Sequence, residues 1–480
     1  MNADANQMRF DLLFEEPLTD SAKAGIAERL RYQRVTRLMQ AWQKHRERKE
    51  SSSRLSAAVA FFRGLEAIAQ EGGEGVLPFI DRWPVSYFVS RNYHDNGKEE
   101  LAYGRLAVDL LYSTLPNGAS PLAGLTFATL LERDGSLLAL GREGRLFIDG
   151  VTPSTGSLVW SCSAQTATIT HMSDRGSSAE IDLPLPLGEK PFAHLRRNAV
   201  ANGFEIPILD DGADVLLTRG YSPDHEDMPP PISAAADKPL ALADSLGQAH
   251  DALAALWPDV IPWATALVPA VADMGRRDSG AARLSGSFAP GEPIYLTQVT
   301  NPLFHAEDLI HEVQHLRFAL TVPAGQWFGR WNEEGDKFIS PYRPDLRPIA
   351  GIHLGLHAFV AVTEFGLRAI KEPTLGHVGL NWLYDTHLRN LFAFHTIANH
   401  ERLSGEGKSY YRKTGCVLAD QHRRLNVLLG PRQREQVLSS LSWPVRPVSE
   451  GDAAANASLD IRQIASAEDI DGLISPEFAA

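Results

Sequence analysis

The sequence of 480 residues contains only two cysteines, Cys162 and Cys416. Two cysteines are too few for a disulfide framework or for a zinc module built on cysteine. Proteins with so few thiols are common in a reducing compartment, so we expect a cytoplasmic protein.

The sequence also lacks an excess of positive charge. It has 46 Lys and Arg against 59 Asp and Glu, which gives a net charge of -13. A protein that binds nucleic acid or a membrane surface through charge needs a basic face, so we expect neither partner. The first residues show no basic segment followed by a long apolar run, and we expect no signal peptide and no membrane span. The hydrophobic content of 44% is that of an ordinary soluble protein.

Residue patterns predict an α+β fold, with a mainly helical C-terminal half and a smaller N-terminal half that contains antiparallel strands. Between Leu137 and Leu187, short β-favouring runs alternate with Gly, Ser, Asp and Pro turns. The Pro-rich segment from Tyr221 to Pro239 marks a boundary, and the composition turns polar and acidic after Trp443. We therefore expect an N-terminal helical segment (1–75), a mixed α/β region with a small antiparallel sheet (76–235), a helical domain (236–445) and a flexible acidic tail (446–480).

The segment from Ala22 to Arg48 is crowded with Arg and Lys and has the apolar spacing of a helix. Such a basic cluster is either a solvated helix face, which is the more common case, or a surface for an acidic partner or peptide. The sequence leaves both alternatives open.

The most informative stretch runs from Phe304 to Leu320 and contains His311, Glu312 and His315 in the pattern HExxH. Asn301 and Pro302 are typical of a helix start. Two histidines four residues apart face the same side of a helix, where their imidazoles can bind one metal ion. The sequence therefore predicts a metal site on this helix.

A second helix is expected to begin at Pro348 and to end near Ile370, ahead of Pro373. His353, His357 and Glu364 fall on roughly one face of it, where a third metal ligand is expected. An HExxH helix followed by a ligand on a second helix is the layout of zinc peptidases with a glutamate as third ligand. By residue chemistry alone, Glu364 would complete a site of two histidines and one carboxylate.

The segments LIHEVQH, YRPDLRPIAG and HAFVAV, together with SGSFAPGEPIYLT before them, resemble the α-ketoglutarate-dependent HExxH peptide β-hydroxylases, which occur with gene clusters for peptide natural products. The resemblance covers about residues 284–368. It implies a mononuclear Fe(II) site that uses α-ketoglutarate and O2 to hydroxylate a side chain of a ribosomal precursor peptide. It also implies that His357, in the HAF segment, is the third ligand beside His311 and His315, with Glu364 next in line and His353 after it.

Arg343 and Arg347 precede the second helix, and a guanidinium can hold the distal carboxylate of a keto acid through two parallel hydrogen bonds. The resemblance favours Arg347, in the DLRP segment. A salt bridge of either arginine to Asp345 or Asp336 is the alternative.

Glu312 distinguishes the two enzyme classes. In a zinc peptidase this residue is the general base that takes a proton from the attacking water. In the hydroxylase no such base is needed, and Glu312 would orient a ligand or cofactor. Without the resemblance, the motif would indicate a zinc metallopeptidase with Zn in place of iron.

Overall fold

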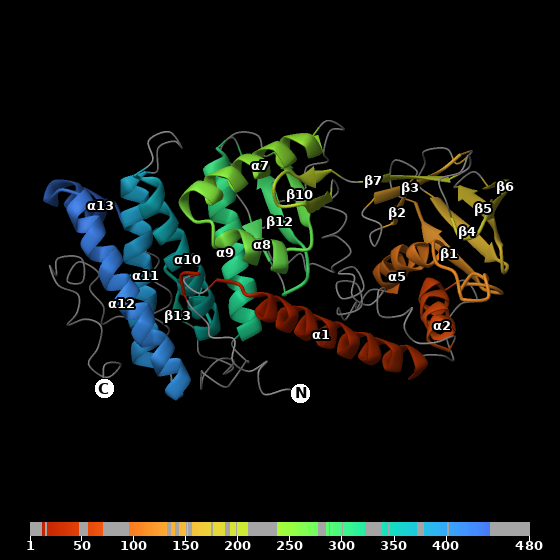
Figure 1. Ribbon diagram of the computed structural model, residues 1–480, viewed down its shortest axis with the longest axis horizontal. Coiled ribbons are helices and arrows are strands. Elements are labelled where there is room, and N and C mark those ends of the chain that lie inside the picture. The colour runs from red at the N-terminus through yellow and green to blue at the C-terminus, as the bar shows by residue number, and fades with distance from the viewer. Residues whose placement is uncertain are drawn as a thin grey trace.

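The computed structural model describes residues 12–14, 17–47, 56–70, 96–131, 136–139, 144–149, 151, 156–173, 176–187, 193–197, 199–209, 238–276, 285–287, 289–299, 301–321, 338–343, 346–371, 379–400 and 403–441. The fold is α+β, as expected, with antiparallel sheets in the N-terminal half and helices gathered in the C-terminal half (Figure 1). The acidic tail at 446–480 lies outside the described residues.

The N-terminal half consists of two helices packed on two antiparallel sheets. In β4 the buried residues Leu158, Trp160 and Cys162 alternate with more exposed ones, so one face of its sheet covers a core. The four-stranded sheet has the order β1-β4-β5-β6, and the three-stranded sheet the order β2-β3-β7. The elements are α2 (Ala57–Gln70), α5 (Asn96–Leu110), β1 (Thr126–Leu130), β2 (Leu137–Ala139), β3 (Gly144–Ile148), β4 (Gly156–Cys162), β5 (Thr166–Ser173), β6 (Gly176–Pro184) and β7 (Ala193–Arg197).

The middle of the chain forms a five-stranded sheet with the order β11-β12-β10-β9-β8, in which β10 is parallel to both β9 and β12. Because β8 and β9 pair into this sheet, the hydrophobic core divides before β8, earlier than the boundary expected near residue 235. The elements are β8 (Val200–Ala201), β9 (Ile206–Leu209), α7 (Lys238–Leu256), α8 (Val260–Leu267), β10 (Val271–Arg276), β11 (Ser285–Gly286), β12 (Ile294–Gln298) and α9 (Pro302–Thr321).

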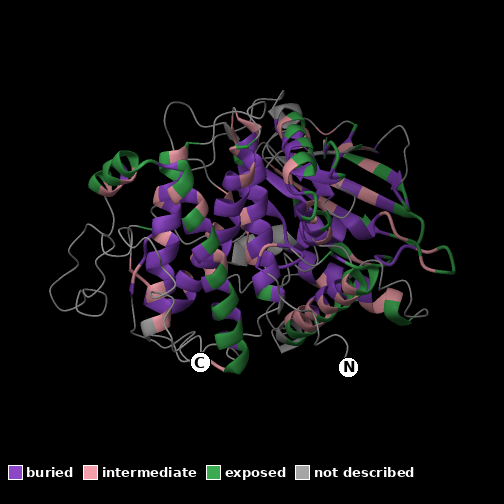
Figure 2. Cartoon of the chain, turned by 60° about the vertical axis from the view of Figure 1, so that its left-hand side comes forward, coloured by how far each residue is buried: buried purple, intermediate pink, exposed green. Residues whose placement is uncertain are grey.

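The last part of the chain is a β-hairpin followed by four helices that share a third core. Helix α10 begins directly after Pro348 and ends at Ala369, which confirms the expected second helix. It is the one helix of the described part that is long and apolar enough to cross a membrane, but 78% of its apolar window is buried in the fold, as in the core helix of a soluble protein (Figure 2). The elements are β13 (Phe338–Ile339), β14 (Leu346–Arg347), α10 (Ile349–Ala369), α11 (Leu380–His400), α12 (Gly405–Leu428) and α13 (Pro431–Ser440).

Helix α1 (Asp20–Glu47) connects the two halves of the molecule (Figure 1). Ile26 and Leu30 are buried in the core that contains α8 and α9, whereas Leu38 is buried in the core of the N-terminal half. Arg29 donates a hydrogen bond of 2.7 Å to the carbonyl of Leu320, at the end of α9. The helix predicted from the basic segment is therefore a structural bridge as well as a charged surface.

Two histidines meet in the interface of α11 and α12. His387 Nε2 lies 3.2 Å from His422 Nδ1, and neither side chain is exposed. Burial, followed by the charge of His422, lowers the pKa of His387 well below 6.5, although a hydrogen bond with Gln421 opposes this shift. His387 is thus a core histidine, which is the interpretation that its spacing in the sequence favours.

The low pKa of His387 gives an expected dependence of stability on pH. The unfolded chain binds a proton near pH 6.5 whereas the folded chain resists it, so this residue should leave stability unchanged above pH 6.5 and lower it as the pH falls below that value. The variant His387→Gln cannot ionise and should lose less stability on acidification, as measured by urea unfolding on both sides of pH 6.5. The same substitution at the partly exposed His250 should leave the pH dependence unchanged.

Candidate metal centre

Helix α9 carries the HExxH motif with one face in the core. Its start is fixed by Asn301, whose Oδ1 accepts a hydrogen bond of 3.0 Å from the backbone N–H of Leu303. Leu309 and Val313 are fully buried against the sheet and α7, so the helix cannot rotate about its axis without exposing them. His311 and His315 are on another face and are half-buried.

The two histidines converge. Their Nε2 atoms are 3.0 Å apart and their rings are nearly perpendicular, at 88°. Two nitrogen donors about 2.1 Å from one ion and at right angles to each other are about 3.0 Å apart, so this pair fits adjacent positions around a metal. Burial, then the charge of Arg343, lowers the pKa of His315 to about 4. His315 is therefore neutral at physiological pH, which is the state that a metal ligand requires.

Glu312 lies beside this pair and is almost fully buried. Its Oε1 accepts a hydrogen bond of 2.7 Å from Ser285 Oγ in β11, whereas its buried Oε2 has no hydrogen-bond partner among the described residues. Burial raises the pKa of Glu312 to about 7, Asp308 adds to this shift, and bonds to Ser287 and Ser285 and the charge of Arg343 oppose it. A carboxyl group with this pKa can hold or release a proton near neutral pH.

An aromatic pair closes the site from the side of α10. The ring of Phe359 packs edge-on against His311 at 4.7 Å between centroids, and Tyr342 stacks on Phe359 at 4.8 Å. Tyr342 is followed by Arg343, whose charge acts on both Glu312 and His315. Of the two predicted arginines, Arg343 is thus the one that the structure brings to the histidine pair. For Arg347 the structure records no such effect on the pair.

His357, the expected third ligand, does not join the histidine pair. Its Nε2 is 3.0 Å from the carbonyl oxygen of Gln314, and its Nδ1 is 2.9 Å from the hydroxyl of Tyr410. A carbonyl can only accept, so Nε2 carries the proton and Nδ1 accepts from Tyr410. Neither nitrogen retains a lone pair for a metal, so the structure gives His357 a role in holding α9, α10 and α12 together instead of the expected one.

The two alternative ligands are also engaged elsewhere. Glu364 forms ion pairs with Arg368 at 3.1 Å and with Arg424 at 2.7 Å. His353 Nδ1 is hydrogen bonded to the hydroxyl of Tyr411. Within the described ranges, no group of three or more His, Cys, Asp and Glu side chains is arranged to hold a metal. The described part of the site therefore supplies two ligands, His311 and His315.

A polar network fixes the opposite side of α9. Gln314 donates to the carbonyl of Leu12 at 2.6 Å and accepts from Arg317 at 2.9 Å. The guanidinium of Arg317, which is 1% exposed, lies between the rings of Phe14 and Trp263, at 4.1 and 4.3 Å from their centroids. The N-terminal strip around Leu12 and Phe14 is thus anchored on the back of the histidine helix.

Sequence reasoning assigned no role to Ser285, Ser287 or Phe359. The two serines belong to the SGSF segment and Phe359 to the HAF segment, and both segments carry the resemblance described above. Their place in the motif-like segments was therefore the available signal, but only the fold reveals that the serines reach Glu312 and that Phe359 reaches His311.

Comparison with known proteins adds no relative. The sequence matches none of the protein-family models searched, and no curated protein is similar enough to be counted as a homologue.

Proposed function

We propose that this protein is an Fe(II)- and α-ketoglutarate-dependent oxygenase that hydroxylates the β-carbon of a residue in a ribosomally made peptide. The observation that carries the proposal is the convergence of His311 and His315 at 3.0 Å beside the positive charge of Arg343. The nitrogen separation favours the right angles of an octahedral ion, because tetrahedral donors at the same bond length would be about 3.4 Å apart. The resemblance over residues 284–368 supports the same class.

The residues around the pair divide the work. His311 and His315 would hold the iron, which together with α-ketoglutarate and O2 supplies the oxidising chemistry when bound. Arg343 would hold the distal carboxylate of the keto acid, since a guanidinium can bind both of its oxygens. Phe359 excludes water from one side of His311, and Ser285 holds Glu312 in place. The peptide substrate, and a cytoplasmic location where such peptides are made, belong to the same proposal.

A zinc metallopeptidase is the second candidate, and one observation favours it. The unpartnered Oε2 of Glu312 and the pKa of about 7 suit a general base that takes a proton from an attacking water. In that case the enzyme would need no keto acid, and Glu312→Gln would abolish the activity.

The test is anaerobic reconstitution of the purified protein with Fe(II) and α-ketoglutarate. A keto acid chelated to ferrous iron gives a weak visible absorption band, which should appear with the unmodified protein and vanish in His311→Ala. If the band is absent and the protein as purified retains tightly bound zinc, the peptidase becomes the better assignment.

The two arginines provide a sharper prediction. Arg343→Gln is expected to weaken α-ketoglutarate binding by roughly 10- to 100-fold, because a charge-assisted bond contributes about 1.5–3 kcal/mol. Arg347→Gln is the matched control and should change the affinity much less. Titration of the visible band with keto acid measures both, and the reverse order would return the role to Arg347.

A further inference from the structure

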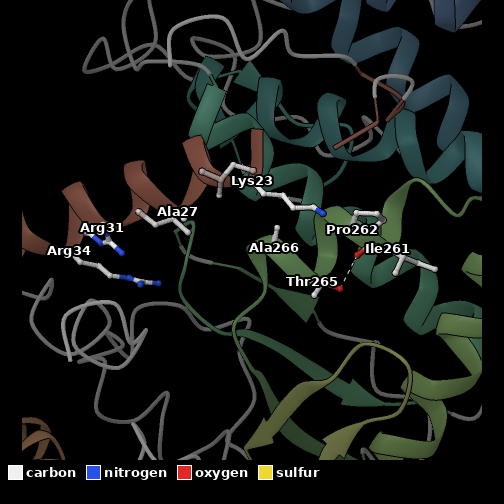
Figure 3. A pocket seen from close by; sticks show the side chains of 10 residues that line it. Lys23, Ala27, Arg31, Arg34, Ile261, Pro262, Thr265 and Ala266 are labelled. Atoms are coloured by element: carbon white, nitrogen blue, oxygen red, sulfur yellow. Dashed lines mark hydrogen bonds between the residues drawn. The ribbon is translucent and has the colours of Figure 1, made fainter. Parts of the chain in front are cut away.

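A groove lies between α1 and α8, away from the histidine pair (Figure 3). Its volume is about 670 Å³, within the range of roughly 300–1,000 Å³ that is usual for binding pockets. Lys23, Ala27, Arg31 and Arg34 of α1 line one wall at steps of four, four and three residues, so they share one helix face. The apolar lining comes from both helices: Ile26, Ala27, Leu30, Ile261, Pro262 and Ala266.

The charge of this groove runs against that of the whole protein. Its described lining includes three cations and no Asp or Glu, in a chain with a net charge of -13. Helix α1 itself has seven Arg and Lys against three Asp and Glu. Lys23 and Arg31 are exposed at the rim, while Arg34 is buried at one end. A ligand that complements the groove must therefore combine carboxylates with apolar side chains.

The position of the groove connects it to the histidine helix. Arg29 of α1 is bonded to Leu320, nine residues along α9 from His311, which is about 13 Å at 1.5 Å per residue. An extended chain covers that distance in about four residues. A segment seated between α1 and α8 can thus be part of the same peptide that reaches the histidines.

We propose that the α1–α8 groove binds an acidic segment of a peptide partner, with its apolar side chains on Ile26, Leu30 and Ile261 and its carboxylates on Lys23 and Arg31. Two facing helices offer a trough for an amphipathic peptide, and the surrounding cations select an acidic one. In identifying this partner with the peptide substrate, the inference rests on the function proposed above. The groove would then hold a part of the substrate that is not modified, and would position the rest.

Fluorescence anisotropy with short labelled peptides tests the proposal on the full chain. The probe is a peptide of Glu and Leu with helical periodicity, and its control replaces each Glu with Gln. We expect binding of the Glu peptide that weakens with added salt, and at least about tenfold weaker binding of the Gln peptide. Equal affinity for the two peptides would overturn the proposal.

The matching protein variant is Lys23→Glu/Arg31→Glu, which reverses two exposed charges. Each exposed ion pair contributes up to about 1 kcal/mol, so we expect the Glu peptide to bind about tenfold more weakly. The control is Lys413→Glu, an exposed position of α12 outside the groove, and it should bind as the unmodified protein does. Equal binding by both variants would reject the groove as the site, and so would laurate binding there in preference to the peptide.

The assay is run in the presence of EDTA, so it does not depend on the metal. Peptide binding without a keto-acid band would leave the groove assigned and the oxygenase refuted. A keto-acid band without peptide binding would do the opposite.

Discussion

His311→Ala is expected to lower the affinity for Fe(II) by at least about 100-fold and to abolish turnover, because it removes one of the two convergent imidazoles. His315→Ala should have the same effect. Metal content after dialysis, together with the keto-acid band, measures the loss. These are the largest functional effects expected for single substitutions in the described part of the chain.

His357→Gln is the control for this prediction, since His357 is bonded through both nitrogens to Tyr410 and Gln314. It should retain the metal and lower the free energy of unfolding by about 1–3 kcal/mol, because a buried partner is left without its hydrogen bond. Loss of metal from His357→Gln at unchanged stability would restore His357 as the third ligand.

Arg317→Ala is expected to lower the free energy of unfolding by roughly 3–4 kcal/mol. The substitution leaves a cavity between Phe14 and Trp263 and removes two cation–π contacts and the hydrogen bond to Gln314. Urea unfolding measures the change, and Lys413→Ala on the exposed face of α12 should stay within about 0.5 kcal/mol of the unmodified protein. A midpoint for Arg317→Ala equal to that control would contradict this account of the back of α9.

The helices that carry the candidate site could be predicted because their ends are marked locally. Asn301 and Pro302 mark the start of α9, and Pro348 the start of α10. The strands between Leu137 and Leu187 were predictable from their alternation with turn residues. Strand β10 was not, since the apolar run from Ile261 to Met274 has no turn signal that separates α8 from it. Its parallel pairing with β9 and β12 depends on residues far apart in the chain.

The site was predictable only where it depends on a single helix. The spacing of His311 and His315 determines that they converge, whatever the rest of the fold. The role of His357 depends instead on how α10 is rotated against α9 and α12, which spacing within one helix does not specify. That rotation directs His357 to Gln314 and Tyr410, and directs Glu364 to two arginines. The same packing brings Arg343 rather than Arg347 to the histidines.

The bridge formed by α1 has a consequence for how the chain is made. Arg29 finds its partner Leu320 only 291 residues later, and Ile26 and Leu30 share their core with α9. At about 5–20 residues per second, a ribosome needs roughly 15–60 s to supply that partner. During this time the apolar stripe of α1 is without part of its partner surface, so the nascent chain is expected to be a substrate for chaperones until α9 emerges.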